Sequence, residues 1–361
     1  MKRALVVSGI PYSNSNRGID IITKSLVRMD VRVDHLVFPR PFYLKQIQKV
    51  EENISGVKQL YAPKKLIYYS EKWMWWFPDF VIGGVVKRIA SKTFLPFSEY
   101  NLVILESGKP LFLLDEIPPA CTLVYRQSDS MKEYLSRNKY LWRLEEKAME
   151  RAQKVFVVRE KFKEILPWEI QNKTSTIPNG FHIDFPKIKM ESPFSSKTKN
   201  VIYLGYTPLD LDTTNFLCRK FPKVYFHFIG TPFSRKDLQV LKKNSNFFNY
   251  GVLRSEKYLP YLMYADVAIT PFKKTVTKHI GLNSKFLLFM RLGLPIVSFF
   301  LGFMEEMEGL PVAFVQSKEE FAQALLKFLS KGEKNFYPVN FDAFSQQGRM
   351  IEYQKVLQGF F

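Results

Sequence analysis

Short runs of apolar residues alternate along the chain with longer stretches whose apolar positions recur at helical spacing. Residues 138–152 are one such stretch, with Leu and Ala on one face and Glu and Lys on the other, and they predict a crossover helix. Short buried strands that alternate with helices are typical of a parallel α/β sheet. Seven runs in the first half predict strands: 4–10, 31–38, 57–62, 101–107, 121–129, 154–159 and 174–180.

The pattern stops once and then starts again, which indicates two domains. Residues 186–200 are rich in Ser, Lys and Pro and lack periodicity, so they predict a linker. The chain has 361 residues, more than the ~250–300 at which a single core usually stops growing. Six further runs follow at 200–206, 223–230, 246–252, 266–272, 295–300 and 312–317, with a helix expected over 318–329.

We therefore predict two Rossmann-like, doubly wound α/β domains that face a central cleft. The first spans residues 1–185 and the second spans 201–341, with 186–200 as the linker. A weaker amphipathic pattern over 342–358 predicts a C-terminal helix that is a candidate to pack back on the first domain. This is architecture rather than function, because such folds support many chemistries.

The charge balance favours an anionic partner. Lys and Arg number 53 against 34 acidic residues, a net charge of +19, which suits nucleic acid, phosphorylated ligands or an anionic membrane. No nucleic-acid-binding motif is visible and the charge is not concentrated on one element, so nucleic acid is not the expected partner. A basic nucleic-acid-binding protein, or a non-catalytic module that binds nucleotide sugars, remains the alternative function.

Compartment and metal binding are indicated by what the sequence lacks. Cys121 and Cys218 lie far apart and in no zinc spacing, which favours a reducing, cytoplasmic compartment. No stretch approaches the ~18–20 apolar residues of a spanning helix. We expect neither a metal nor another cofactor.

Polar residues follow the predicted strands of the first half, where ligands of parallel sheets bind. Ser13, Asn14 and Arg17 lie in a long polar loop after the first strand. This loop lacks the Gly-x-Gly-x-x-Gly pattern of dinucleotide-binding proteins, which weakens a dehydrogenase interpretation. We favour a substrate-binding loop on the acceptor side; the alternative is an ordinary connection from strand to helix.

Two strand ends in the first half also carry carboxylates. Glu106 follows the fourth strand, and Arg126 and Asp129 end the fifth. A carboxylate within hydrogen-bond reach of an acceptor hydroxyl is a suitable general base, and Asp129 is the candidate, with Glu106 and Arg126 as further acceptor-side groups. Alternatively, Asp129 caps the helix expected after it, and Glu106 is a solvated strand end.

In the second half, residues 282–295 predict a helix that begins with a cation. Asn283 or Ser284 is a natural N-cap, and Lys285 then lies in the first turn, where a positive charge opposes the helix dipole. A bound diphosphate would compensate this charge, since helix N-termini bind anions. The alternative is that Lys285 points into water.

Residues 73–92 combine aromatic and basic side chains. Trp73, Trp76, Phe77, Phe80 and Val81 fall at helical spacing, Pro78 is expected in the first turn, and three basic residues follow. This composition suits the surface of an anionic membrane, and we prefer that interpretation because three Trp within four positions are hard to bury together. The alternative is a core helix with a Trp-rich edge.

Several stretches together resemble a known family. The passage Ile177-Pro178-Asn179-Gly180, a linker and then Tyr203-Leu204-Gly205 resembles the interdomain passage of GT-B glycosyltransferases. More specific are Glu-Ser at 106–107 with Pro110, Tyr-Arg-x-Ser-Asp at 125–129, Ile-Thr-Pro-Phe at 269–272 and Asn-Ser-Lys-Phe-Leu-Leu at 283–288. These are similar to the glucuronosyltransferase of xanthan assembly and its relatives, glycosyltransferase family 70.

That resemblance implies a GT-B fold and inverting, metal-independent transfer from a UDP-sugar to a lipid-diphosphate-linked acceptor in surface polysaccharide assembly. The enzyme would then lie peripherally at the inner face of the cytoplasmic membrane. Glucuronate is one candidate for the sugar, although Val252 stands where the family has Glu and Phe272 where it has Tyr. The residues implied as donor-binding are Gly205, Tyr206, Leu253, Phe272, Asn283, Ser284 and Lys285, and Asp129 is implied as the base.

One further absence agrees with an inverting mechanism. Many retaining GT-B enzymes carry two Glu eight residues apart in the C-terminal domain, the first opposite the donor sugar. Residues 270–289 of this chain contain no acidic residue, which disfavours a retaining enzyme of that kind.

Overall fold

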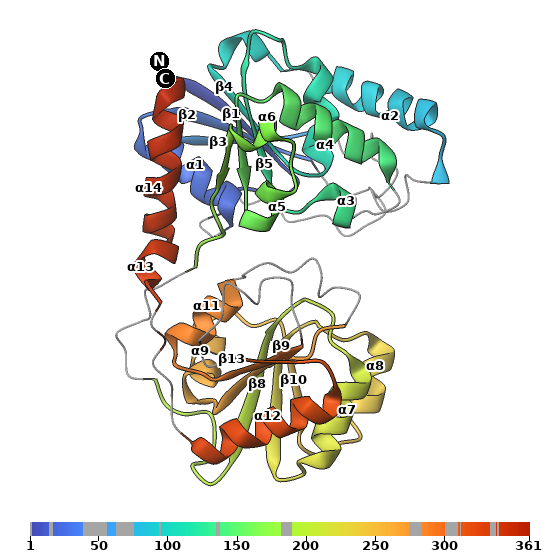
Figure 1. Ribbon diagram of the computed structural model, residues 1–361, viewed down its shortest axis with the longest axis vertical. Coiled ribbons are helices and arrows are strands. Elements are labelled where there is room, and N and C mark those ends of the chain that lie inside the picture. The colour runs from blue at the N-terminus through green and yellow to red at the C-terminus, as the bar shows by residue number, and fades with distance from the viewer. Residues whose placement is uncertain are drawn as a thin grey trace. The chain divides into compact units, whose positions relative to one another are not determined.

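The structure is a computed structural model that divides into two compact units, Met1–Gly180 with Ala343–Phe361, and Phe181–Asp342. Each unit contains one parallel sheet between layers of helices (Figure 1). The described residues are 2–13, 17–38, 56–62, 76–93, 95–134, 138–181, 190–273, 284–299, 310, 312–332, 337 and 339–361.

The first unit is built on a seven-stranded parallel sheet in the order β3-β2-β1-β4-β5-β6-β7. Ala4 and Val6 of β1 face one hydrophobic cluster and Leu5 and Val7 face the other, as the period of two of a strand requires. The strands are β1 (Arg3–Ser8), β2 (Arg32–Val37), β3 (Val57–Tyr61), β4 (Leu102–Glu106), β5 (Thr122–Gln127), β6 (Lys154–Val157) and β7 (Thr174–Thr176).

Helices cover both faces of this sheet and generate its two hydrophobic clusters. Asn138 caps α4 by accepting a hydrogen bond from the N–H of Leu141, so the helix predicted over 138–152 begins where its sequence signal places it. The elements are α1 (Gly18–Arg28), α2 (Asp79–Lys92), η3 (Phe97–Glu99), η4 (Lys109–Glu116), α3 (Met131–Tyr134), α4 (Lys139–Arg151), α5 (Glu160–Glu164) and α6 (Trp168–Gln171).

The C-terminal segment belongs to the first unit. After α13 (Phe341–Phe344), helix α14 (Gln346–Leu357) lies along α1 (Figure 1), and η6 (Gln358–Phe360) follows it. Tyr353 is fully buried and meets the ring of Phe156 edge-on, with the ring centroids 5.0 Å apart. Lys2 lies over the ring of Phe361, so the two ends of the chain are neighbours.

The second unit has a six-stranded parallel sheet in the order β10-β9-β8-β11-β12-β13. Its strands are β8 (Lys199–Gly205), β9 (Val224–Gly230), β10 (Phe247–Gly251), β11 (Val267–Thr270), β12 (Ile296–Phe299) and β13 (Val312–Val315). Its helices are α7 (Leu211–Lys220), α8 (Arg235–Leu241), α9 (Ser255–Tyr264), α11 (Ser284–Arg291) and α12 (Lys318–Lys331).

The predicted fold class, two Rossmann-like parallel α/β units, is confirmed. The expected linker, 186–200, is described only from residue 190 onward. There Phe194 packs against the ring of His227, with the centroids 4.6 Å apart, and β8 already begins at Lys199.

The expected helix at Pro78 is present, but the structure shortens its aromatic stripe. Helix α2 begins at Asp79, immediately after Pro78, so Trp76 and Phe77 precede the helix instead of continuing its stripe. Proline lacks the N–H that a longer helix would need at this point, and Trp73 lies outside the described residues. Within the described part of the chain, no helix combines the length and the apolar character needed to cross a bilayer.

Tyr353→Ala tests how much α14 contributes to the first unit. We expect the free energy of unfolding to fall by about 3–5 kcal/mol, because the variant leaves a cavity under the ring of Phe156. Ile351→Ala, on the exposed side of the same helix, should change it by less than about 0.5 kcal/mol. All five Trp lie in the first 180 residues, so urea unfolding followed by Trp fluorescence reports this unit; equal effects of both variants would contradict the prediction.

Candidate functional site

A group of polar residues lies at the carboxyl ends of β1, β4 and β5 in the first unit. The order of the strands reverses between β1 and β4, and open α/β sheets bind ligands beyond the strand ends at such a point. Ser8 ends β1, Glu106 ends β4, and Ser128 directly follows β5. The topology therefore brings together side chains that are 98 and 22 residues apart in the sequence.

Glu106 is held by hydrogen bonds at both of its carboxylate oxygens. Its Oε2 accepts from the hydroxyl of Ser8 at 2.6 Å, and its Oε1 accepts from Ser128 Oγ at 2.7 Å and from Arg126 Nη1 at 3.1 Å. The side chain is only 13% exposed. Glu106, predicted to face the sugar acceptor, is thus fixed in orientation. Its carboxylate oxygens have little capacity left for further hydrogen bonds.

Arg126 lies inside the protein rather than at its surface. The residue is 1% exposed, and its guanidinium donates to Ser128 Oγ, to Asn179 Oδ1 at 2.8 Å and to the hydroxyl of Tyr353 at 3.4 Å, in addition to Glu106. Its role in the structure is to connect β4 and β5 with the segment after β7 and with α14. The sequence position of Arg126 suggested direct contact with the sugar acceptor. Its burial limits such contact.

A glycine makes room for that guanidinium. A Cβ at Gly18, the first residue of α1, would lie 1.9 Å from Arg126 Nη2, closer than any real contact. The N–H of Gly18 also donates to Asn179 Oδ1 at 3.1 Å. The start of α1 is therefore packed directly against the buried charge.

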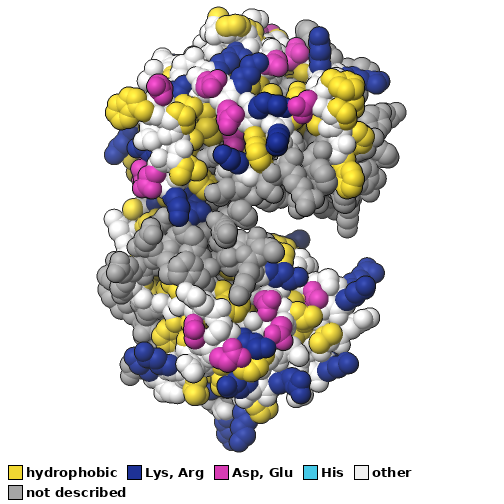
Figure 2. Space-filling model, turned by 45° about the vertical axis from the view of Figure 1, so that its right-hand side comes forward, with side chains coloured by type: hydrophobic (Ala, Val, Ile, Leu, Met, Phe, Trp, Pro, Cys, Tyr) yellow, Lys and Arg dark blue, Asp and Glu magenta, His cyan; other side chains and the backbone are white. Residues whose placement is uncertain are grey.

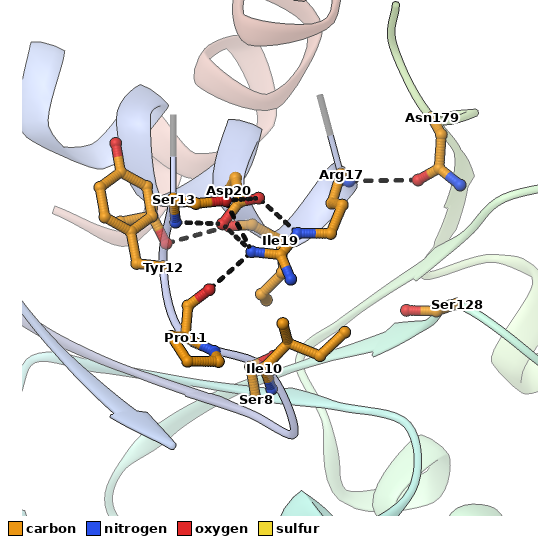
Figure 3. Close-up of polar contacts among 12 residues, drawn as sticks. Ser8, Ile10, Pro11, Tyr12, Ser13, Arg17, Ile19, Asp20, Ser128 and Asn179 are labelled. Atoms are coloured by element: carbon orange, nitrogen blue, oxygen red, sulfur yellow. Dashed lines mark hydrogen bonds and ion pairs between the residues drawn. The ribbon is translucent and has the colours of Figure 1, made fainter. Parts of the chain in front are cut away.

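The loop after β1 is organised around a buried aspartate (Figure 3). Asp20 is fully buried and accepts from Arg17 Nε at 2.6 Å and from the backbone N–H of Ser13 at 3.2 Å. The guanidinium of Arg17 also donates to the carbonyl oxygen of Pro11 at 2.6 Å. Of the three acceptor-side residues predicted in this loop, Ser13 and Arg17 are thus brought together, and Asn14 lies outside the described residues.

Asp129 lies on the short loop between β5 and α3, and its residue is exposed. Ser107 Oγ accepts from the backbone N–H groups of Ser128 at 3.1 Å and of Asp129 at 3.4 Å. Ser130, not Asp129, directly precedes α3. The carboxylate that was predicted as the base is therefore presented at the edge of the sheet, next to Glu106 and Arg126.

In the second unit, two glycines allow close packing at the ends of β8 and β9. Gly205 and Gly230 are register partners. Their φ values are +142° and +111°, which residues other than glycine rarely adopt. A Cβ at Gly230 would lie 1.9 Å from the carbonyl oxygen of Gly205, and a Cβ at Gly205 would lie 2.3 Å from Lys285 Nζ. The ammonium group therefore lies directly against the backbone at the end of β8.

Lys285 is the second residue of α11. Its ammonium donates to Thr207 Oγ1 at 3.3 Å and lies 5.7 and 5.8 Å from the ring centroids of Tyr203 and Phe272, a cation–π arrangement. Burial lowers the pKa of Lys285 to about 8. Protonated Lys285 at this helix start suits an anion, and its positive charge is lost as the pH rises through about 8.

The other predicted donor residues have different surroundings. Tyr206 is 62% exposed and Leu253 packs partly into the core of the second unit. Phe272 is fully buried, so its ring packs under the Lys285 ammonium and does not face solvent. Asn283 and the side chain of Ser284 lie outside the described residues.

Some residues of these networks are missing from the sequence-based prediction. They are Ser8, Asn179, Tyr353, Thr207 and Glu145, whose contacts with β5 and α3 are described below. Only Asn179 carries a local signal, since Asn-Gly ends the predicted run 174–180. The described residues contain no cluster of three His, Cys, Asp or Glu that could hold a metal ion.

No family model and no curated protein matches the sequence. Solved structures, in contrast, match over nearly the whole chain. Sucrose-phosphate synthase from Thermosynechococcus elongatus superimposes with a TM-score of 0.72 at 13% identity, covering 99% of both chains. HepE from Anabaena in complex with UDP and glucose gives 0.65 at 13% identity, covering 99% of this chain and 100% of that one.

The chain has the GT-B fold. The same fold is found in the UDP-GlcNAc 2-epimerase from Methanocaldococcus jannaschii, with a TM-score of 0.56 at 10% identity over 99% of this chain and 100% of that one. The GT-B fold thus carries more than one activity, and the function of this chain has to be argued from its side chains.

Proposed function

We propose that this chain is a glycosyltransferase that moves a sugar from a UDP-sugar to a hydroxyl group of a glycan acceptor. The observation that carries the proposal is the position of Lys285. Its ammonium lies against Gly205 at the end of β8, beside Thr207 and in the first turn of α11. A cation combined with backbone N–H groups at a helix start suits a diphosphate, and the GT-B neighbour HepE was solved with UDP.

Asp129 is the general base of the proposed reaction. Glu106 lies nearby, but Ser8, Ser128 and Arg126 occupy both of its oxygens, which leaves little capacity for a substrate proton. Asp129 is exposed at the same edge. Its carboxylate accepts the proton of the acceptor hydroxyl as that oxygen bonds to C1 of the sugar and the bond from C1 to the phosphate oxygen breaks.

The leaving UDP takes the electron pair of the broken bond. Protonated Lys285 and the N-terminus of α11 stabilise its developing charge, and such preorganised groups are a large source of catalysis. One base and no acidic residue in 270–289 favour inversion at C1 without a metal. An epimerase of the same fold would instead turn over its nucleotide sugar without an acceptor, so dependence on an acceptor separates the two activities.

A lipid-diphosphate-linked acceptor at an anionic membrane is the second part of the proposal. Trp76 and Phe80 are 64% and 80% exposed, and Lys87 and Arg88, exposed as well, follow Phe80 on the same face of α2 by helical spacing. Figure 2 shows basic and acidic side chains intermixed on the visible face. Such dispersed charge supports a local membrane contact better than an extended nucleic-acid surface.

UDP binding tests the diphosphate site. In EDTA, UDP at a hundred times its Kd should stabilise the folded protein by about 2.7 kcal/mol in scanning calorimetry, and GDP and CMP should do less. Because Lys285 must be protonated to bind the diphosphate, affinity should be nearly full at pH 7, fall as the pH rises through about 8, and be about tenfold weaker at pH 9 than at pH 7.

Lys285→Met should abolish most of the UDP affinity and flatten its pH dependence between pH 7 and 9. Lys327→Met removes the same charge from an exposed position of α12 and should behave like the wild type. An unchanged response to UDP in Lys285→Met would overturn the diphosphate site.

Asp129→Asn tests the base. We expect transfer from UDP-glucose or UDP-glucuronate to an alkyl glucoside to fall by at least about a hundredfold, measured as released UDP, while UDP affinity stays unchanged. Glu116→Gln, an exposed carboxylate at the end of η4, serves as the control. Wild-type transfer by Asp129→Asn would exclude this residue as the base, and a product that keeps the configuration at C1 would exclude inversion.

Membrane contact is tested by flotation with vesicles at low salt. The protein should bind vesicles rich in phosphatidylglycerol but not vesicles of phosphatidylcholine alone. The double variant Trp76→Ser, Phe80→Ser should bind at least about tenfold more weakly, since each buried aromatic side chain contributes about 1.5–3 kcal/mol. Trp168→Ser removes a Trp that is 69% exposed on α6 and provides the control; equal losses in both variants would contradict the assignment to α2.

A further inference from the structure

Glu145 is a buried carboxyl group that the proposed reaction does not use. It lies on α4 and is 5% exposed. Burying a carboxylate is costly unless it is hydrogen-bonded, so its partners show what it organises.

Three donors converge on this carboxyl group. Its Oε1 accepts from the hydroxyl of Tyr125 at 2.7 Å and from the amide of Gln127 at 3.2 Å. Its Oε2 accepts from the backbone N–H of Met131 at 3.0 Å. Gln127 is the last residue of β5 and Met131 is the first of α3, so a single carboxylate binds both ends of the three-residue loop that carries Asp129.

The same loop is held on its other side by Ser107 and Glu106. Ser107 Oγ accepts from the N–H groups of Ser128 and Asp129, and Ser128 Oγ donates to Glu106. With these contacts at its start and Glu145 at both ends, the loop has little freedom to move the Asp129 carboxylate.

We propose that Glu145 is a positioning residue that fixes the place of Asp129 by binding both ends of its loop. This inference rests on the proposed function, in which Asp129 is the base. Glu145 acts only through the loop and touches no substrate.

Protonation of Glu145 should weaken its hydrogen bonds to the two ends of the loop, which together form a clamp. Burial raises the pKa of Glu145 to about 7, although its hydrogen bonds with Tyr125, Gln127 and Met131 oppose the rise, and the charge of Glu146 adds to it. Tyr125 stays protonated, since burial and the nearby Glu145 raise its pKa far above its usual value. All three partners remain donors, so a protonated carboxyl group offers them one acceptor fewer as the pH falls through about 7.

Glu145→Gln keeps the shape of the side chain but turns an NH₂ group toward donors. Hydrogen exchange of the amides of residues 128–131, corrected for intrinsic rates, should be roughly ten- to hundredfold faster for Met131 than in the wild type at pH 8. In the wild type the same protection should decrease between pH 8 and pH 6, whereas in Glu145→Gln it should be low at both. Glu146→Gln, an exposed neighbour on α4, should keep wild-type protection at pH 8.

The rate of UDP release from UDP-glucose supplies a second readout. For Glu145→Gln, kcat should fall roughly ten- to hundredfold with unchanged UDP affinity, and the decline of the wild-type rate near pH 7 should disappear. In Glu146→Gln that decline should move to lower pH, because removing the neighbouring charge lowers the pKa of Glu145.

The outcomes separate this inference from the proposed function. If Asp129→Asn is inactive while Glu145→Gln has the wild-type kcat and pH profile, the positioning role is overturned and the proposed function stands. If no UDP-sugar is turned over by the wild type, the proposed function fails. In that case the exchange of Met131 alone decides: unchanged exchange in Glu145→Gln overturns the clamp, and faster exchange upholds it.

Discussion

The guanidinium of Arg126 is a buried charge whose requirements organise the first unit. A charge removed from water needs partners for all of its polar atoms, and those partners come from β4, from the loop after β5, from Asn179 and from Tyr353 of α14. Segments separated by up to 227 residues therefore have to meet at one point. The absence of a side chain at Gly18 is part of the same requirement, because only a glycine leaves space for this group at the start of α1.

A related constraint acts in the second unit, on a smaller scale. The ammonium of Lys285 can lie against the end of β8 only because Gly205 has no side chain, and Gly205 can adopt its backbone geometry only because Gly230 is a glycine as well. The aromatic rings of Tyr203 and Phe272 replace part of the water around the charge. Burial in this setting lowers the pKa of the lysine, so the packing that makes the site also sets the pH range in which it is positive.

The strands and the fold class were predictable because they depend on local patterns. Apolar runs such as 101–107 and 223–230 match β4 and β9 within one or two residues, and the helical spacing over 138–152 matches α4. Pro78, expected in the first turn, stands directly before α2, because a proline suits a helix start. The aromatic spacing, in contrast, continues through Pro78 to residues that precede the helix, since spacing alone does not mark a helix boundary.

The candidate site was predictable only in part, for a physical reason. Glu106 at a strand end and Lys285 at a helix start can be found from the rules that ligands bind at the strand ends of such sheets and anions at helix N-termini. Tyr353 and Glu145 cannot, because each lies at an ordinary position of an amphipathic helix. Their roles arise from contacts that only the folded topology creates.

Three carboxylates near the same edge of the first sheet illustrate how environment assigns different tasks to one functional group. Glu106 is engaged at both oxygens and serves the frame around Arg126. Glu145 is buried among three donors, and its pKa is raised to about 7. Asp129 is exposed between them on a loop that the other two help to hold. A base needs both a defined position and access to a substrate proton, and in this arrangement the two hydrogen-bonded glutamates provide the position while the exposed carboxylate keeps the access.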